Sequence, residues 1–332
     1  MQRLRGPSMK RLHLLALLGA ALFGLAAAPV RADTYPGRVV TVVVPYPAGG
    51  SVDGVARLLA QKLGEQLGQS FIVENRAGGA GGIVGANYVA KAAPDGYTLM
   101  LTASIHVVTP FLHKAVPYDV VTDFTPVTLV ASGPLIVSTN AQTPAKTLKE
   151  FFDLVRKDPN KYTFATSSFG SAGHMAIELL KRDAGVDTLV VPYKGASPAL
   201  TDLMSGQVQL IADPILSSLP LVKAGSIKAL AITSARRVDI APEIPTVAES
   251  GMTGFEFGSW YGLWGPKGLP ADLVTTIQAE VAKIVQRPEV RDRFALLGFE
   301  PLGSTPDYFA GYIRDEMAKY ERIIKDANIK AE

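Results

Sequence analysis

Apolar residues along the chain alternate between short unbroken runs, which are typical of buried strands, and runs with a spacing of three or four residues, which are typical of helices. Val39 to Val44 is an unbroken β-branched run, and Val55, Leu59, Leu63 and Leu67 follow it at helical spacing. The Pro-Ala-Gly-Gly-Ser segment between them indicates a loop. This part of the chain is therefore predicted to form a strand, a loop and a helix.

The same alternation continues to the C-terminus. Further strands are predicted at Phe71 to Val73, Tyr97 to Leu101, Leu135 to Ser138, Tyr162 to Thr166, Leu189 to Val191, Val208 to Ala212 and Ala229 to Thr233, and helices at Ile83 to Ala93, Leu273 to Val285 and Tyr308 to Ile324. Thr147 to Glu150 predicts a capping box that begins another helix, which we expect Pro159 to end. Continuous apolar strands separated by helices predict a parallel sheet covered on both faces, which is an α/β fold.

The first 32 residues are predicted to be a signal peptide. Four basic residues lie within the first eleven positions, an uncharged apolar stretch runs from Leu12 to Ala28, and Val30-Arg31-Ala32 carries the small residues that a signal peptidase reads. The apolar stretch is shorter than the ~20 residues of a typical membrane span, so an anchor is the weaker alternative. We expect the mature chain to begin at Asp33, with cleavage after Ala28 as an alternative.

The composition of the chain excludes several classes of function. Removing the leader removes five basic and no acidic side chains, so 28 basic and 30 acidic residues remain and the net charge changes from +3 to −2. A nucleic acid or an anionic membrane surface therefore has little electrostatic attraction for the mature chain. The absence of cysteine excludes thiol catalysis, thiolate zinc sites and iron–sulfur clusters. The three histidines beyond the leader have no metal-binding spacing, so neither a metal nor a cofactor is expected.

About 300 mature residues exceed what one hydrophobic core usually fills, so we expect two α/β lobes. No Ser/Gly/Pro-rich linker separates them. Lobes without a flexible linker indicate hinge strands that cross between them and permit closure around a ligand.

Two segments imitate catalytic motifs. Gly78 to Gly85 follows a strand but lacks the G-x-G-x-x-G spacing of a dinucleotide site. Ser171 resembles the serine of a nucleophile elbow, but Phe169 stands where the motif requires glycine, and His174 is expected beside the serine backbone. A serine hydrolase is therefore the weaker alternative. His174 is either a donor near the ligand or a core residue.

The segments that follow the predicted strands are rich in small, hydroxylated and glycine residues. In doubly wound sheets, ligands bind at the carboxyl ends of the strands, where helix N-terminal N–H groups attract anions. Ordinary helix capping is the alternative for Ser51, Asp53 and Ser171. The residues singled out at these strand ends are Tyr46, Ala48, Gly49, Gly50, Ser51, Thr102, Ser104, Ser167, Ser168, Phe169, Gly170, Ser171, Tyr193, Lys194 and Asp213. Their repetition in both halves favours binding over catalysis.

Five motifs, in this order over essentially the whole mature chain, resemble the solute receptors of tripartite tricarboxylate transporters, the Bug-type proteins. They are Val43-Val44-Pro45-Tyr46-Pro47-Ala48-Gly49-Gly50-Ser51 with Asp53, Val73-Glu74-Asn75-Arg76, Ala93-Pro94-Asp95-Gly96-Tyr97, Val191-Pro192-Tyr193-Lys194-Gly195 and Ile244-Pro245-Thr246. The resemblance implies a periplasmic, two-lobe Venus-flytrap protein of the type II class. It is expected to be a monomer that captures a small organic acid and delivers it to membrane permease subunits, or presents it to a sensor.

The resemblance also implies an organisation and a site. Lobe 1 would comprise residues 33–133 and 259–332, lobe 2 residues 134–258, with hinge crossings near Gly133 and Gly258 and the ligand cleft between the lobes. Family members hold a ligand carboxylate through two loops, one from each lobe. Carried onto this chain, those positions are Tyr46, Ala48, Gly49, Gly50, Ser51 and Asp53 in lobe 1, and Ser167, Ser168, Gly170, Ser171, His174, Tyr193 and Lys194 in lobe 2.

Three positions depart from the family pattern. Val52 stands where threonine is common, Phe169 where a polar residue such as asparagine is common, and Pro214 where asparagine often follows the aspartate. Each change removes side-chain hydrogen bonding. We therefore expect a ligand with one anchored carboxylate and an apolar body, an aromatic or aliphatic acid rather than citrate, with Trp260 and Trp264 as a candidate wall.

Overall fold

The computed structural model describes residues 35–330, and the helices and strands all lie in one compact unit that begins at Arg38. The predicted signal peptide lies outside the described residues. No helix within the described range is both long and apolar enough to cross a membrane.

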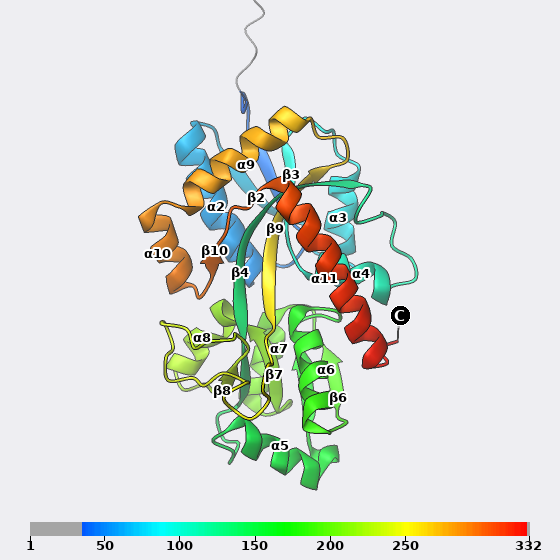
Figure 1. The fold of residues 1–332 in the computed structure, drawn as a ribbon, viewed down its shortest axis with the longest axis vertical. Helices are drawn as coiled ribbons and strands as arrows, with labels where there is room; N and C mark the ends of the chain where they lie inside the picture. The colour runs from blue at the N-terminus through cyan, green and yellow to red at the C-terminus, as the bar shows by residue number, and fades with distance from the viewer. Residues whose placement is uncertain (1–34, 331–332) are drawn as a thin grey trace, which may run out of the picture. The chain divides into compact units, whose positions relative to one another are not determined.

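One ten-stranded sheet forms the centre of this unit (Figure 1). Its main path runs in the order β2-β1-β3-β9-β4-β7-β5-β6, and β8 and β10 each pair with β4. The strands are β1 (Val40–Val44), β2 (Phe71–Asn75), β3 (Thr98–Ala103), β4 (Phe124–Asn140), β5 (Thr163–Thr166), β6 (Leu189–Pro192), β7 (Leu210–Pro214), β8 (Ile227–Ile232), β9 (Gly258–Pro266) and β10 (Glu300–Pro301).

The α/β class is confirmed, and the whole sheet is mixed, with parallel strands at its two ends. At one end β1 pairs in parallel with β2 and β3, and at the other end β5 pairs in parallel with β6 and β7. Between these groups, β9 and β4 run antiparallel to their neighbours. The prediction of a mostly parallel sheet flanked by helices in each half is confirmed at both ends, whereas β9 and most of β4, which supply the antiparallel pairs, were not predicted.

Strand β4 belongs to both groups of strands. Its first part pairs with β9 as far as Pro134, and from Leu135 onward it pairs with β7 and β8. At the change, Pro134 lies opposite Gly258, and a Cβ on Gly258 would lie 3.1 Å from the carbonyl oxygen of Gly133. Glycine therefore permits the two long strands to approach closely where they pass from one group to the other.

Helices cover the sheet on both sides (Figure 1). The predicted helices are present, while α4, α7, α8 and α10 were not predicted. In α4 and α8 a proline lies inside the helix, Pro110 and Pro220, and a proline at such a position is normally a helix breaker. The α-helices are α2 (Ser51–Leu67), α3 (Ile83–Ala90), α4 (Ile105–Leu112), α5 (Leu148–Lys157), α6 (Ala172–Ala184), α7 (Ala196–Ser205), α8 (Ile215–Lys223), α9 (Ala271–Val285), α10 (Pro288–Leu296) and α11 (Pro306–Asp326), with short 3₁₀ turns at Ala80–Gly82 and Pro159–Lys161.

The predicted capping box before α5 is confirmed at its threonine. The Thr147 side chain accepts a hydrogen bond from the Glu150 N–H at 3.1 Å. The Glu150 carboxylate accepts from the N–H of Lys146 at 2.7 Å, one residue earlier than the motif requires. Both side chains therefore still satisfy backbone donors that the helix leaves free.

Both tryptophans are core residues. Trp264 packs edge to face against His106, Phe124 and Phe309. Trp260 donates its indole N–H to Glu316 of α11 at 2.9 Å. Each is 1% exposed, so packing accounts for them.

Candidate functional site

The loop between β1 and α2 presents the start of a long helix. Helix α2 begins at Ser51, and its N-cap is Gly50, which has no side chain with which to cap the first turn. Gly49 before it has a φ of +87°, a conformation that favours glycine. The loop thus leaves helix N–H groups available to an anion, as a carboxylate site requires.

Asp53 fixes this loop. Its Oδ2 accepts hydrogen bonds from the Gly49 N–H at 3.0 Å and from Arg57 Nε at 2.9 Å, and its Oδ1 accepts from Asn75 Nδ2 at 3.0 Å. Burial alone raises the pKa of Asp53, but the hydrogen bonds from Arg57, Gly49 and Asn75 outweigh it and hold the pKa below its ordinary value. Both oxygens are engaged within the protein, so Asp53 shapes the loop.

Tyr46 is held by hydrogen bonds to neighbouring polar groups, whereas Ser104 lies in the core. The Tyr46 hydroxyl forms a 2.7 Å hydrogen bond with Thr102 Oγ1, and the Tyr46 carbonyl accepts from Asn75 Nδ2 at 3.1 Å. Burial raises the pKa of the Tyr46 phenol. Ser104 is buried. Burial raises the pKa of Tyr320 on α11 and the Ser104 hydroxyl partly opposes that shift, so Ser104 lies beside Tyr320 in the core.

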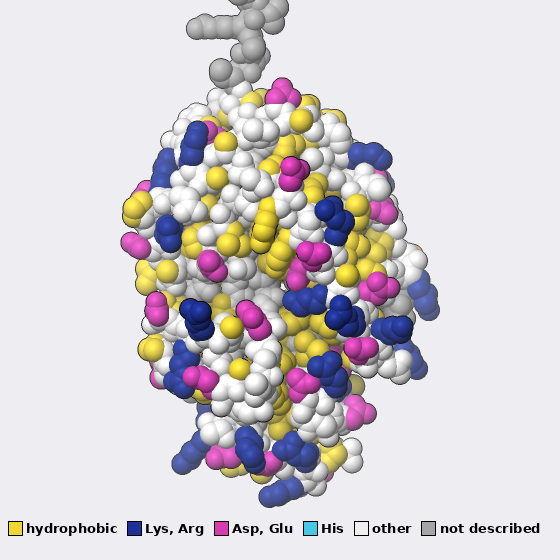
Figure 2. Space-filling model, viewed as in Figure 1, with side chains coloured by type: hydrophobic (Ala, Val, Ile, Leu, Met, Phe, Trp, Pro, Cys, Tyr) yellow, Lys and Arg dark blue, Asp and Glu magenta, His cyan; other side chains and the backbone are white. Residues whose placement is uncertain are grey.

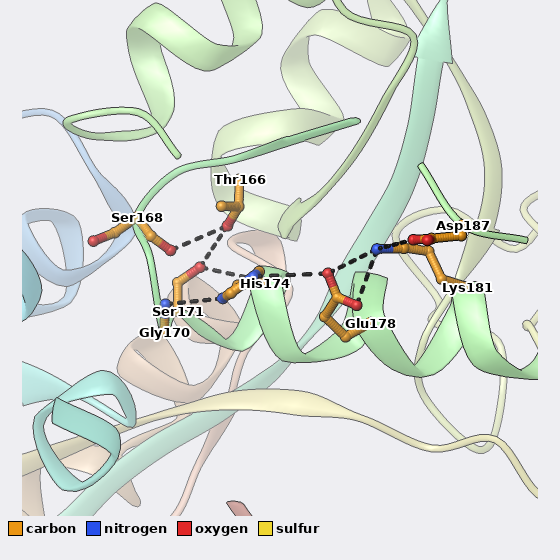
Figure 3. Close-up of polar contacts among 8 residues, drawn as sticks. All are labelled: Thr166, Ser168, Gly170, Ser171, His174, Glu178, Lys181 and Asp187. Carbon is orange, nitrogen blue, oxygen red and sulfur yellow. Dashed lines mark hydrogen bonds and ion pairs between the residues drawn. The ribbon is translucent and has the colours of Figure 1, made fainter. Parts of the chain in front are cut away.

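The loop between β5 and α6 is held by hydroxyl groups (Figure 3). Ser171 is the N-cap of α6, and its Oγ accepts from the His174 N–H at 3.2 Å. The same Oγ forms a 2.8 Å hydrogen bond with Thr166 Oγ1, which also donates to the Ser168 carbonyl at 3.2 Å. Ser171 is therefore a capping residue inside a small hydroxyl network, which was the alternative reading of the sequence.

The His174 ring faces away from the Ser171 hydroxyl. Its Nδ1 accepts a hydrogen bond from the Gly170 N–H at 3.1 Å, and its Nε2 lies 3.8 Å from the Glu178 carboxylate, which pairs with Lys181 (Figure 3). Burial, and then the charge of Lys181, lower the pKa of His174 to about 4, so the ring is neutral. A nucleophile–base pair needs the ring nitrogen at the serine oxygen, and here it binds the loop backbone instead.

Contacts join the loops of the two strand groups. The Phe169 ring centroid lies 6.0 Å from that of His113 at the end of α4 and 4.9 Å from that of His174. A Cβ on Gly195 would lie 4.0 Å from Pro47 of the β1–α2 loop. The polar strand ends of both groups therefore face each other at short range.

Tyr193 and Lys194 differ in their surroundings. The Tyr193 hydroxyl donates to Asp202 at 2.6 Å, and burial followed by this carboxylate raises the Tyr193 pKa to about 12. The Tyr193 N–H also bonds the Thr166 carbonyl at 2.9 Å, which ties its loop to β5. Lys194 and Ala48 are exposed.

Asp213 ends strand β7 and is 0% exposed. Neither carboxylate oxygen forms a hydrogen bond of ordinary geometry with the residues that the structure describes, although the hydroxyls of Ser167 and Ser217 lie nearby. Burial raises the pKa of Asp213 to about 7, and the nearby hydroxyls of Ser167 and Ser217 only partly oppose that shift. A buried carboxyl without a partner is costly, so it points to a function.

Tyr261 and Ser217 are neighbours of Asp213 that the sequence analysis did not single out. Burial raises the pKa of Tyr261 to about 12, and both Ser51 and Asp213 influence it, which places this phenol between the first turn of α2 and the end of β7. Tyr261 lies in β9, which was not predicted, although the buried apolar run between Gly258 and Gly265 was an available signal. In the described part of the chain, no three His, Asp or Glu side chains gather as a metal site requires.

One cavity lies away from these residues. A cavity of about 590 Å³ at the strand crossing is lined by Gly133, Gly258 and Trp260, and by none of the predicted ligand residues. Its cations Arg237 and Lys319 already form ion pairs with carboxylates of the chain. Basic and acidic side chains are interspersed over the face drawn in Figure 2, without a large area of one sign. We do not assign this cavity to the ligand.

Comparison with known proteins identifies the relatives of this chain. Residues 55–329 match the tripartite tricarboxylate transporter family receptor. Rpa4515 of R. palustris, solved with adipate, is 37% identical with a TM-score of 0.87, and the match covers 90% of this chain and all of that one. The periplasmic binding protein BugD is 35% identical, with a TM-score of 0.84 and the same coverage. MatC (Rpa3494) from Rhodopseudomonas palustris, solved with malate, is 36% identical with a TM-score of 0.80 over 87% of this chain and all of that one.

Proposed function

The chain belongs to the tripartite tricarboxylate transporter family of receptors and is a solute-binding receptor, and from this premise we propose that it captures a small carboxylate in the periplasm and delivers it to a membrane permease. The observation that carries the proposal is the glycine-capped start of α2, whose Ser51 lies beside Tyr261, a neighbour of Asp213, while Ser167 of the hydroxyl-rich β5–α6 loop also lies beside Asp213. Helix N–H groups and hydroxyls together suit a carboxylate. The adipate and malate bound by two relatives support this class of ligand.

The two groups of strands act as lobes in this proposal. Lobe 1 comprises residues up to 133 and from 259, and lobe 2 comprises residues 134–258, so β4 and β9 form the hinge. The change of pairing at Pro134 and the close approach of Gly133 and Gly258 support a hinge at this point. The contact of Phe169 with His113 supports a closed form in which the loops of the two lobes meet.

The cargo in this proposal carries one anchored carboxylate and an apolar body. Val52 is buried and Phe169 is partly buried between two histidines, which adds apolar surface where the family commonly has polar side chains. Pro214 begins α8 as its N-cap and offers no side-chain donor. Monocarboxylates with an aromatic or aliphatic body are therefore expected to bind better than citrate.

Export is the remaining part of the proposal. The leader over residues 1–32, with its basic start and apolar centre, supports secretion to the periplasm, where the family relative BugD resides. Purified periplasmic protein is expected to begin at Asp33, which N-terminal mass analysis checks directly.

Thermal unfolding of the chain from Asp33 to Glu332 tests the function. A panel of mono-, di- and tricarboxylates is screened, and a ligand present at 100 times its Kd adds about 2.7 kcal/mol to the free energy of unfolding, which raises Tm by several degrees. A saturable shift with one acid, recovered unchanged in mass, is expected. A flat panel with a ligand-free protein overturns the proposal, and consumption of the acid indicates an enzyme instead.

A further inference from the structure

Four buried polar atoms without a protein partner gather at the end of β7. They are both carboxylate oxygens of Asp213, the hydroxyl oxygen of Ser217 in the first turn of α8, and the phenol oxygen of Tyr261 in β9. Burial raises the pKa of Asp213 and the Ser217 hydroxyl partly opposes that shift, while burial and then the charge of Asp213 raise the pKa of Tyr261, so the three side chains are neighbours. Buried polar groups in folded proteins nearly always have partners, so this cluster has room for a hydrogen-bonding group from a water molecule or a ligand.

The cluster lies beside the start of α2. After burial, both Ser51 and Asp213 affect the pKa of the Tyr261 phenol. The phenol therefore lies near Ser51, the first residue of α2, and near Asp213. A Cβ on Gly54 would lie 2.9 Å from Leu216 Cδ2, which shows that the first turns of α2 and α8 pack together here. The unpartnered atoms therefore adjoin the helix N-terminus that is proposed to anchor the ligand carboxylate.

Nothing in the surrounding protein neutralises Asp213. The groups that face it are Ser167 from the β5–α6 loop, Ser217 from α8 and Tyr261 from β9. Within the described residues, no Lys, Arg or His side chain forms an ion pair with it. A second carboxylate placed against it would add like-charge repulsion to the cost of burial, whereas a donor would satisfy the lone pairs of its oxygens.

We propose that Asp213 is a specificity-determining residue that accepts a hydrogen bond from an ammonium or hydroxyl group on the carbon next to the ligand's anchored carboxylate. The inference rests on the proposed carboxylate-receptor function and narrows its ligand to 2-amino or 2-hydroxy acids. The adjacent carbon is the expected position because Asp213 and the start of α2 share Tyr261 as a neighbour. The apolar body of the ligand then extends away from this polar corner.

Two matched sets of acids test the inference by calorimetry. Succinate, malate and aspartate differ only in carrying hydrogen, hydroxyl or ammonium beside one carboxylate, and phenylacetate, mandelate and phenylglycine differ in the same way. In the set that binds, the hydroxyl and ammonium members are expected to bind roughly tenfold or more tighter than the hydrogen member, since hydrogen bonds to a charged group are the stronger ones. Equal binding, or tighter binding of succinate or phenylacetate, overturns the inference without any variant.

The Asp213→Asn variant keeps the shape of the side chain and removes its charge. It is expected to reduce the preference for the ammonium member to less than threefold, mainly by weakening that ligand. Glu316→Gln is the matched control, because Glu316 is also a buried carboxyl but is bonded to Trp260 and Lys319 and lies apart from the cluster. Full discrimination in Asp213→Asn overturns the inference and leaves the receptor function standing, whereas no binding of any carboxylate by the wild-type protein overturns both.

Discussion

Two buried aspartates, one on each side of the proposed cleft, have opposite surroundings. Asp53 in lobe 1 accepts hydrogen bonds from a backbone N–H, a guanidinium and an amide, and its pKa lies below the ordinary value. Asp213 in lobe 2 forms no hydrogen bond of ordinary geometry with the described residues, and burial raises its pKa to about 7. One carboxylate is stabilised by the fold, and the other is destabilised by it.

The serines of lobe 2 show the same contrast. The Ser171 hydroxyl caps α6 and bonds Thr166, whereas the Ser217 hydroxyl, within the described structure, has no partner. Polar groups that are satisfied within the protein give a loop its shape, and those left unsatisfied are available to a ligand. Sequence motifs alone do not separate the two roles, because both use the same residue types.

Asp213 gives the largest expected effect, which is a pH dependence of stability. Its pKa is higher in the folded protein than the ordinary 3.8, so its contribution to stability is complete below about pH 4 and is lost as the pH rises through about 7. The full loss is about 4 kcal/mol at about 1.36 kcal/mol per pKa unit. Without ligand, Asp213→Asn is therefore expected to gain stability relative to wild type between pH 4 and 7.

Urea unfolding at several pH values measures this difference. Glu316→Gln serves as the control, since that carboxylate accepts hydrogen bonds from Trp260 and Lys319 and its removal is expected to destabilise the protein. A difference between wild type and Asp213→Asn that stays constant from pH 4 to 8 would show that the Asp213 carboxyl is not held in an unfavourable environment.

Asp53→Ala is expected to have the next largest effect, a loss of about 3 kcal/mol. The change leaves the half-buried hydrogen bonds from the Gly49 N–H and the Asn75 amide without their charged acceptor, and a hydrogen bond to a charged group contributes about 1.5 to 3 kcal/mol. The Arg57 contribution is small because its side chain is 54% exposed. Ligand-induced Tm shifts should shrink together with stability. If Asp53→Ala loses stability but binds the ligand with unchanged affinity, Asp53 does not set the loop geometry that binding requires.

Ser171→Ala is expected to cost about 1 kcal/mol, the usual effect of losing an N-cap. Thr147→Ala is the matched control, because Thr147 caps α5 in the same way and is not among the predicted ligand residues. Both variants should lose similar stability in thermal unfolding, and only Ser171→Ala should weaken carboxylate binding. Equal affinities in the two variants would mean that the β5–α6 loop does not contact the ligand.

Strands and helices were predicted correctly where the apolar periodicity was clear. The prediction failed where a proline or glycine residue, which normally ends a strand, lies inside one. Strand β4 was predicted only from Leu135 to Ser138, since Pro126, Gly133 and Pro134 read as breakers. The strand accommodates Pro126 by a shift in register and places Gly133 and Pro134 where it changes partners. Long-range pairing thus overrode local propensity, which single residues do not reveal.

The sequence indicated where the residues of the candidate site lie, but not which of their polar atoms are hydrogen-bonded within the protein. Strand ends indicated where Tyr46, Ser171 and Asp213 would lie, because the carboxyl ends of parallel strands share an edge. Which hydroxyl or carboxylate is already bonded depends on partners far away in sequence, as with Asn75 for Asp53. Tyr261 was missed because Gly258, Gly262 and Gly265 interrupt the apolar run of β9, which contains no β-branched residue.

Replacing Lys194 is expected to have the smallest effect on stability and binding. Unlike the two buried aspartates, this residue is exposed. No carboxylate of the described residues pairs with it, so Lys194→Ala should leave stability unchanged within about 0.5 kcal/mol. A free cation beside the β6–α7 loop attracts an approaching carboxylate, and its removal is expected to slow association about twofold at low salt. Stopped-flow binding at low and high salt checks this. A loss of affinity that persists at high salt would instead indicate that Lys194 contacts the ligand directly. Lys194 would then be an exposed polar group that the ligand bonds, in contrast to Asp53, which is bonded within the protein, and Asp213, which is buried.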